Sequence, residues 1–184
     1  MTISDGDFNR LVNFIQSNYG INLAQKRQLI TGRLSTAIKQ KGYNSFSDFV
    51  NHLLQTKDEA EITLLLDKLT TNYTFFMREQ DSLDYFRKNI IPEVVQRHQK
   101  DKTLAIWSAG CSSGEEPYNI TMFLFDYLGT QAKQWDTRLL ATDISSQAMA
   151  TARRGVYELP DTIPPDWKRK YFVPNQGRSV RRLS

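Results

Sequence analysis

Four successive segments at the start of the chain have apolar residues at helical spacing. The pattern predicts that Ser4 or Asp5 caps the first helix and that Gly20 ends it. Ser45 with Asp48 resembles a capping box for the third helix. The four predicted helices cover about residues 8–19, 24–40, 46–54 and 62–69. Because short loops join them, we predict a small helical bundle.

A segment without clear periodicity follows this bundle. Residues 69–79, LTTNYTFFMRE, include β-branched and aromatic side chains but neither alternate nor form a helical stripe, so we interpret them as an ordered connection. Apolar residues then predict a helix over about 83–91. Pro92 should break or kink that helix, which continues briefly before the polar run 96–102.

The rest of the chain alternates between strand-like and helical patterns. In order, the patterns predict a strand at 103–109, a helix over 115–128 ended by Gly129, a strand at 138–143, and a helix capped by Ser145 and stopped by Gly155. This order forms a βαβ unit and implies a parallel sheet. After Tyr157 the chain is rich in proline, and SVRRL at 179–183 is predicted to be one more edge strand.

The predicted fold class is therefore α + α/β. We expect a helical N-terminal domain with the connection at 1–78, and a partial α/β domain at 79–184. Two predicted parallel strands are fewer than the five or so of a doubly wound sheet, so we expect an incomplete sheet. Its open strand edge is expected to be sticky and to allow self-association.

Composition adds limits on location and partners. Cys111 is the only cysteine, which excludes an internal disulfide and suits a reducing cytoplasm. The N-terminus has no secretion signal, and the apolar runs are too short to span a bilayer, so we expect a cytoplasmic protein without membrane insertion. The net charge of +4 suggests an acidic partner, such as nucleic acid, an anionic membrane or an acidic protein; ordinary solubility charge explains it equally well.

The candidate chemistry lies where the first predicted strand ends. Small residues from Ser108 to Gly114 form a turn, and Glu115 and Glu116 open the following helix. The spacing Gly110-x-x-x-Gly114 departs from the dinucleotide fingerprint G-x-G-x-x-G, and two glutamates would compete with a pyrophosphate for the helix N–H groups. The next strand ends in Asp143, an acid suited to a ribose hydroxyl pair.

These features favour an adenosyl ligand without phosphates, and S-adenosylmethionine fits this description. Alternatively, the glutamates only complement the helix dipole.

Three motifs resemble those of one family, the chemotaxis-receptor methyltransferases of the CheR type. They are GCSSGEEPYNI at 110–120, ATDIS at 141–145 followed by the A-x-x-G-x-Y run 152–157, and LTTNYTFFMRE at 69–79. The last departs from the family pattern because Met77 stands where phenylalanine is usual. The helical N-terminus also resembles that of the family. The resemblance implies the first βαβα part of a Rossmann-like, S-adenosylmethionine-dependent methyltransferase domain.

The resemblance also implies roles for individual residues. Arg78 would pair with the methionyl carboxylate, Glu115 rather than Glu116 would meet polar groups of the cofactor, and Asp143 would hold the adenosyl part. The full set implied to bind the cofactor is Asn72, Thr74, Arg78, Gly110, Glu115 and Asp143. Without the resemblance, Arg78 is better explained by a surface salt bridge, and turn capping explains Asn72 and Thr74 equally well.

The family transfers a methyl group to glutamates of bacterial chemoreceptors, forming methyl esters and S-adenosylhomocysteine. A glutamate acceptor is already ionised at neutral pH, so no general base is expected, and neither His52 nor His98 needs to be catalytic. We expect no metal site. The receptor is an acidic helical bundle, and Lys26, Arg33 and Lys39 are predicted to steer it; a merely solvated helix face is the alternative.

Two other classes of function remain open at this stage. One is a catalytically impaired fragment or a cofactor- and receptor-binding module, and we expect weak cofactor binding and little activity from this polypeptide alone. The other is a nucleic-acid methyltransferase, but the sequence has no cluster of aromatic and basic residues that would stack bases, so we expect no nucleic-acid partner.

Overall fold

The computed structural model describes residues 1–174 and 180–183, which divide into two compact units, Met1–Thr71 and Asn72–Ser184. The predicted boundary lay later, after Arg78. The division comes earlier because the connection packs with the second unit: Phe76 is buried there between the rings of Tyr157 and Phe172, at centroid distances of 5.0 and 5.6 Å. Each unit is described separately below.

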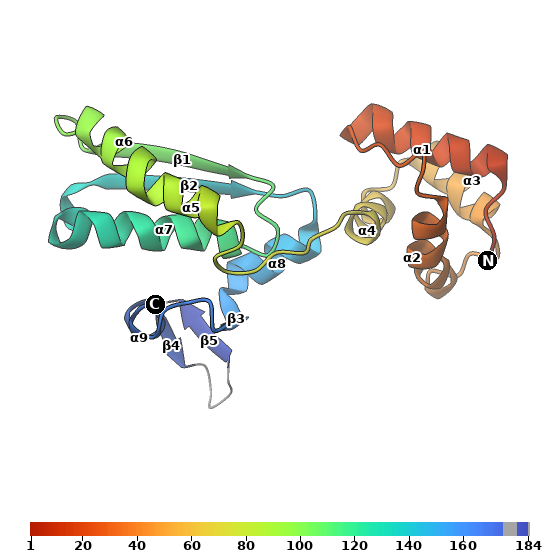
Figure 1. Cartoon of the computed structure of the whole chain (residues 1–184). Helices are drawn as coiled ribbons and strands as arrows, with labels where there is room; N and C mark the ends of the chain where they lie inside the picture. Colours follow the sequence, from red (N-terminus) through yellow and green to blue (C-terminus); the bar gives the residue numbers. More distant parts are fainter. Residues whose placement is uncertain (175–179, 184) are drawn as a thin grey trace. The chain divides into compact units, whose positions relative to one another are not determined.

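The first unit contains the four predicted helices (Figure 1). They are α1 (Asp5–Tyr19), α2 (Arg27–Gln40), α3 (Phe46–Thr56) and α4 (Glu59–Leu69). Ser4 caps α1, Gly20 ends it with a φ of 70°, and Ser45 caps α3 by accepting the N–H of Asp48, as predicted. Helix α2 begins later than predicted, so Lys26 is its N-cap residue and not part of a helical face.

The four helices bury one apolar core. Each helix contributes from the stripe that the sequence predicted, through Leu11, Ile15, Ile30, Leu34, Ile38, Phe46, Phe49, Leu53 and Leu65. A buried carboxylate, Asp7, joins two helix starts because the hydroxyls of Ser4 in front of α1 and Ser47 in α3 both donate to it. These hydrogen bonds, that from Ser47 above all, lower the pKa of Asp7.

The second unit begins with a helix that changes its winding. The α-helix α5 (Gln80–Tyr85) passes into one π-helical segment, η1 (Phe86–Ile90), and then into α6 (Ile91–Arg97), which has Pro92 in its first turn. Pro92 has no N–H to donate to the preceding turn, and Ile91 donates to the carbonyl of Phe86, five residues back. The predicted interruption at Pro92 therefore takes the form of a π turn.

The predicted βαβα order is confirmed. Strands β1 (Thr103–Ala109) and β2 (Asp136–Thr142) pair in parallel, with Trp107 opposite Leu140. Helix α7 (Glu115–Leu128) and the short 3₁₀ helix η2 (Gly129–Gln134) connect them, and α8 (Ser146–Arg154) follows β2. In Figure 1, α7 runs alongside the two strands. The opposite face of the sheet exposes Trp107 and Leu140, at 67% and 58% of their surface.

Only one strand of the last part of the second unit was predicted. Strands β3 (Val156–Glu158), β4 (Phe172–Pro174) and β5 (Val180–Leu183) form an antiparallel sheet in the order β3-β5-β4, and α9 (Pro165–Tyr171) precedes β4. The strand predicted at 179–183 is confirmed as β5, but its predicted position at an edge was wrong, because β5 pairs on both sides and lies at the centre of this small sheet. Ser179 itself lies outside the described residues.

Within the described ranges, no helix is both long and apolar enough to cross a membrane.

Candidate functional site

The glycine loop between β1 and α7 folds over the end of β2. The N–H groups of Gly110 and Cys111 both donate to the carbonyl of Thr142, over 2.8 and 2.9 Å. Gly110 has a φ of 81° and Gly114 one of 101°, a backbone region that side chains rarely adopt. At Gly114 space is limiting too, because a Cβ there would lie 2.8 Å from the hydroxyl of Tyr157.

Asp143 connects this loop to the next helix. One carboxylate oxygen accepts the N–H of Ser112 over 2.7 Å, and the other accepts the N–H of Ser145, the cap of α8, over 2.8 Å. A carboxylate offers about four acceptor positions, so each oxygen keeps capacity for a ligand hydroxyl. Asp143 directly follows β2 and fixes the loop through these two hydrogen bonds.

The paired glutamates at the start of α7 occupy different environments. Glu115 is buried, and its carboxylate accepts from the hydroxyl of Ser113 over 2.7 Å. Glu116 is exposed, and its carboxylate accepts from the hydroxyl of Ser108 in β1 over 2.7 Å. The positive end of the helix dipole stabilises both carboxylates. Dipole complementation, the alternative to a ligand contact, is therefore compatible with such a contact.

The connection before α5 lies against the loop. The hydroxyl of Ser112 donates to the carbonyl of Asn72 over 2.8 Å. Exposure alternates along the segment: Asn72, Thr74 and Phe76 are less exposed than Tyr73 and Phe75. The sequence did not predict this alternation, which shows an extended segment with one face turned inward.

Arg78 continues this segment as a half-exposed side chain. Its guanidinium donates to the carbonyl of Tyr73 over 2.9 Å and pairs with Glu79 at 3.3 Å. The surface salt bridge that the sequence offered as an alternative is therefore present. Such a pair contributes little and leaves the guanidinium accessible to a stronger partner.

Five of the six predicted cofactor residues therefore lie in one region, which is held together by hydrogen bonds of these residues or of the residues next to them. Asn72, Gly110, Glu115 and Asp143 lie on or next to the glycine loop, and Arg78 is tied to the carbonyl beside Asn72. For Thr74 the structure gives only its half-buried position in the same segment.

The electrostatics of the region favour a cationic ligand. Glu115, Glu116 and Asp143 place three carboxylates around one short loop. Burial, and next the charge of Asp143, raise the pKa of the Cys111 thiol, so Cys111 is a poor nucleophile. In the part of the chain that the structure describes, no group of three or more His, Cys, Asp or Glu side chains could hold a metal ion.

Sequence reasoning missed the residues that organise the loop. Ser108, Ser112 and Ser113 each bind a site residue through the side chain, and Tyr157 donates to the carbonyl of Ser113 over 2.6 Å. In the sequence the serines stand out only as small residues of a turn. Tyr157 ends the A-x-x-G-x-Y run, whose pattern by itself predicts no role for the phenol.

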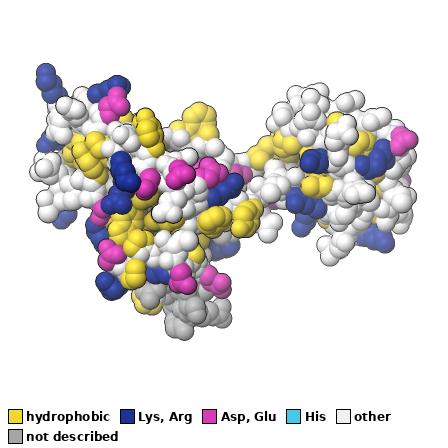
Figure 2. Space-filling view, in the orientation of Figure 1, with side chains coloured by type: hydrophobic (Ala, Val, Ile, Leu, Met, Phe, Trp, Pro, Cys, Tyr) yellow, Lys and Arg dark blue, Asp and Glu magenta, His cyan; other side chains and the backbone are white. Residues whose placement is uncertain are grey.

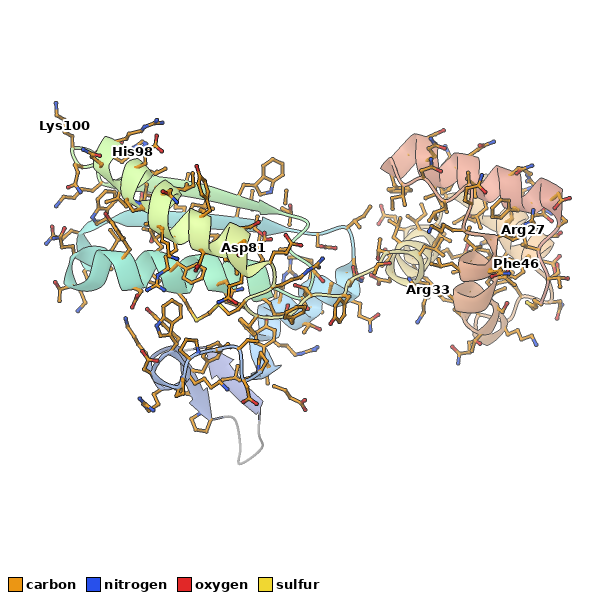
Figure 3. All side chains as sticks on the ribbon, viewed as in Figure 1. Arg27, Arg33, Phe46, Asp81, His98 and Lys100 are labelled. Atoms are coloured by element: carbon orange, nitrogen blue, oxygen red, sulfur yellow. The ribbon has the colours of Figure 1, made fainter. Side chains whose placement is uncertain are left out.

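The three predicted receptor-facing residues lie in the first unit and differ in their contacts. The guanidinium of Arg33, labelled in Figure 3, donates to the carbonyl of Thr70 over 3.0 Å and so caps the end of α4. Lys39 is exposed in the last turn of α2, and Lys26 is exposed at the N-cap position, just before the helix begins. Residues 24–42 hold five Lys or Arg and no acidic residue. The face of this unit in Figure 2 displays several basic side chains.

Both histidines are half-exposed and lie beside a carboxylate. His98 contacts Asp101 at 3.1 Å, and His52 lies 3.7 Å from Glu61. The imidazole of His98 has its hydrogen-bond partner in Asp101, outside the glycine loop.

Comparison with known proteins identifies both units. Residues 6–70 match the family model described as the CheR methyltransferase all-alpha domain, and residues 72–183 match the CheR methyltransferase SAM binding domain. These ranges divide where the two compact units divide.

Three curated relatives are each named chemotaxis protein methyltransferase. The chain is 37% identical to the one from Borreliella burgdorferi over 85% of the chain and 56% of the relative. It is 32% identical to that of Salmonella typhimurium over 96% of the chain and 59% of the relative. It is 31% identical to that of Escherichia coli over 96% of the chain and 60% of the relative. The chain thus spans somewhat more than half the length of these relatives.

Proposed function

This chain belongs to the CheR methyltransferase family, whose cofactor is S-adenosylmethionine, and on that premise we propose that it binds this cofactor at the glycine loop and serves methyl transfer to chemoreceptor glutamates. The observation that carries the proposal is the set of three carboxylates, Glu115, Glu116 and Asp143, around that loop. Carboxylates attract ammonium and sulfonium groups and repel phosphates, so they fit an adenosyl ligand that is cationic and free of phosphate.

Asp143, Gly110 and Arg78 remain available for the proposed contacts. Asp143 keeps acceptor capacity for ribose hydroxyls, and Gly110 lets a ligand approach the backbone closely. Glu115 meets the polar groups of the methionyl part. Arg78 exchanges its exposed pair with Glu79 for the methionyl carboxylate, which suits the fork of a guanidinium. Asn72 and Thr74 complete the proposed cofactor site.

The proposed reaction needs orientation rather than acid–base chemistry. When bound, S-adenosylmethionine supplies a methyl group on a sulfonium and leaves as S-adenosylhomocysteine. The acceptor glutamate is ionised at neutral pH, so no residue of this chain has to remove a proton. The task of the site residues is to hold the reactants in line and to exclude water.

Calorimetric titration tests the cofactor site. We expect S-adenosylhomocysteine to bind the isolated chain weakly, and ATP not to compete, because the carboxylates repel phosphate. Asp143→Asn should weaken binding by about tenfold, as expected for loss of a hydrogen bond to a charged group. Asp126→Asn is the matched control, since Asp126 pairs with Arg87 and Lys170 away from the loop.

The results of this titration, together with an assay for transfer of a labelled methyl group to a receptor, distinguish the alternatives. Equal affinity of both variants, or competition by ATP, would contradict the proposed site. Tight one-to-one binding would support the site and overturn the expected weakness. Binding of cofactor and receptor without transfer of a labelled methyl group would favour a binding module.

We also propose a surface for self-association. A groove of about 510 Å³ with a mainly apolar lining runs between β1 and the helices η1 and α6. The outer edge of β1 has no strand partner among the described residues. Sedimentation of the titration samples at two concentrations should reveal association through this edge; a constant sedimentation coefficient would argue against it.

For the receptor we propose electrostatic steering by the basic residues around α2. Arg33 is also a structural cap of α4, so the sharper test uses Lys39. Lys39→Glu should slow association with a glutamate-rich receptor fragment several-fold at low salt and much less at high salt. Lys57→Glu is the control, because Lys57 is likewise exposed at the end of its helix, α3, and both changes oppose a helix dipole. Equal rates for the two variants would mean that α2 only presents a solvated face.

A further inference from the structure

The A-x-x-G-x-Y run has no part in the proposed contacts, yet it packs directly on the glycine loop. Ala152, at the end of α8, lies so close to Gly114 that a Cβ on this glycine would come within 2.8 Å of the alanine Cβ. The hydroxyl of Tyr118 in α7 donates to the carbonyl of Ala152 over 2.9 Å. Gly155, which ends α8 with a φ of 59°, leaves room for that same hydroxyl.

Tyr157 completes this contact from the first strand of the small antiparallel sheet. Its hydroxyl donates to the carbonyl of Ser113 over 2.6 Å and is the second group that closes the space beside Gly114. The side chain is buried, and burial raises the pKa of the phenol far above its usual value, so the hydroxyl stays protonated and remains a donor. One hydroxyl therefore fixes both the orientation of the Ser113–Gly114 peptide and the space around it.

That peptide determines where the proposed cofactor groups lie. Gly114 is the N-cap residue of α7, and Glu115 is the first residue of the helix. The hydroxyl of Ser113 binds the carboxylate of Glu115. A rotation of the Ser113–Gly114 peptide would therefore move the helix start, the serine hydroxyl and the glutamate together.

We propose that Tyr157 is a positioning residue for the cofactor site. From its place in the small antiparallel sheet, Tyr157 holds the Ser113–Gly114 peptide and, through this peptide, Glu115. The phenol touches no ligand; it acts through the loop backbone. This inference rests on the proposed function where it concerns the cofactor, while the effect on the loop itself can be measured without any ligand.

The test is Tyr157→Phe, which removes one hydroxyl and keeps the ring and its 5.0 Å edge contact with Phe76. The matched control is Tyr171→Phe, because the hydroxyl of Tyr171 also donates to a backbone carbonyl, that of Met122, over 3.2 Å. Met122 lies in the middle of α7, away from the loop. The loop carries its own probe: Cys111 is the only cysteine of the chain and is buried.

The first measurement is the rate at which a thiol reagent labels Cys111 in the folded protein at constant pH. Loss of one buried hydrogen bond should open the loop more often, so Tyr157→Phe should label about five- to tenfold faster than wild type. Tyr171→Phe should label within about twofold of wild type, since local opening is governed by local contacts. Unchanged labelling in Tyr157→Phe, or equal acceleration in both variants, would overturn the proposal.

The second measurement is the affinity for S-adenosylhomocysteine. Tyr157→Phe should weaken this affinity by about the same factor by which it accelerates labelling. Its thermal unfolding temperature should fall no more than that of Tyr171→Phe. If the wild type binds no S-adenosylhomocysteine, the proposed cofactor site fails, but the labelling rates still decide whether Tyr157 positions the loop. Suppose instead that the wild type binds S-adenosylhomocysteine and that Tyr157→Phe labels faster but binds with the same affinity. The positioning role of Tyr157 in the cofactor site is then refuted.

Discussion

Gly114→Ala is expected to destabilise the second unit by about 3 kcal/mol and to abolish cofactor binding. An alanine at positive φ costs about 1–2 kcal/mol, and overpacking costs about 1–3 kcal/mol more. Both apply here, because φ is 101° and a Cβ would lie 2.8 Å from Ala152 and from the hydroxyl of Tyr157. Neither neighbour can move freely, since one is a short side chain on a helix and the other is held by its hydrogen bond.

Urea unfolding of Gly114→Ala and Gly110→Ala separates the two costs. Gly110 lies in the same loop with a φ of 81°, but a Cβ there would meet nothing within 4 Å. It should therefore show only the conformational cost of about 1–2 kcal/mol. Equal loss of stability in the two variants would show that the packing of Ala152 and Tyr157 on Gly114 has no energetic importance.

Phe76→Ala should cost about 3–5 kcal/mol, the range for removing a buried aromatic ring. The ring is 2% exposed and makes edge contacts with Tyr157 in β3 and Phe172 in β4. Its backbone carbonyl also accepts from the hydroxyl of Thr162 over 3.2 Å. Phe76 thereby joins the connection before α5 to the small antiparallel sheet, and its loss should loosen that sheet as well as lower the free energy of unfolding.

The neighbouring residue supplies the control for this experiment. Phe75 is 38% exposed and contacts the exposed ring of Tyr73 at 5.8 Å. Phe75→Ala should cost less than about 1 kcal/mol, as for most surface substitutions. Chemical denaturation followed by tryptophan fluorescence measures both. A cost for Phe76→Ala as small as that for Phe75→Ala would contradict its place in the core.

The sequence predicted the long elements well because their signals are local. The apolar stripe and the caps Ser4, Gly20 and Ser45 each act within a few residues, and all are found as predicted. Strand β1 and helix α7 have the predicted bounds, since an apolar run, two glycines and a helix-opening acidic pair mark them.

The small sheet and the π turn depend on tertiary context. Strands β3 and β4 have only three residues each, too few for an alternating pattern, and their partner β5 lies farther along the chain. A proline signals an interruption, but packing decides whether the helix ends, bends or takes an extra residue into one turn.

The site divides in the same way between local and distant signals. Gly110, Glu115 and Asp143 lie in short motifs whose residue types suggest their chemistry, and hydrogen bonds bring these motifs together. The contacts that hold the loop join residues far apart in sequence: Ser112 to Asn72 and Tyr157 to Ser113, 40 and 44 positions apart. No periodicity or spacing reports such pairs.

The exposed tryptophan on the open face of the parallel sheet gives this chain an optical reporter. Trp135 and Trp167 are 6% and 7% exposed, whereas Trp107 is largely in water. The indole of Trp107 donates to the hydroxyl of Thr142 over 3.0 Å, and the carbonyl of the same threonine receives the first two N–H groups of the glycine loop. A tryptophan in water emits at longer wavelength than buried ones, so the long-wavelength emission originates next to the proposed ligand contacts and can follow the loop without a label.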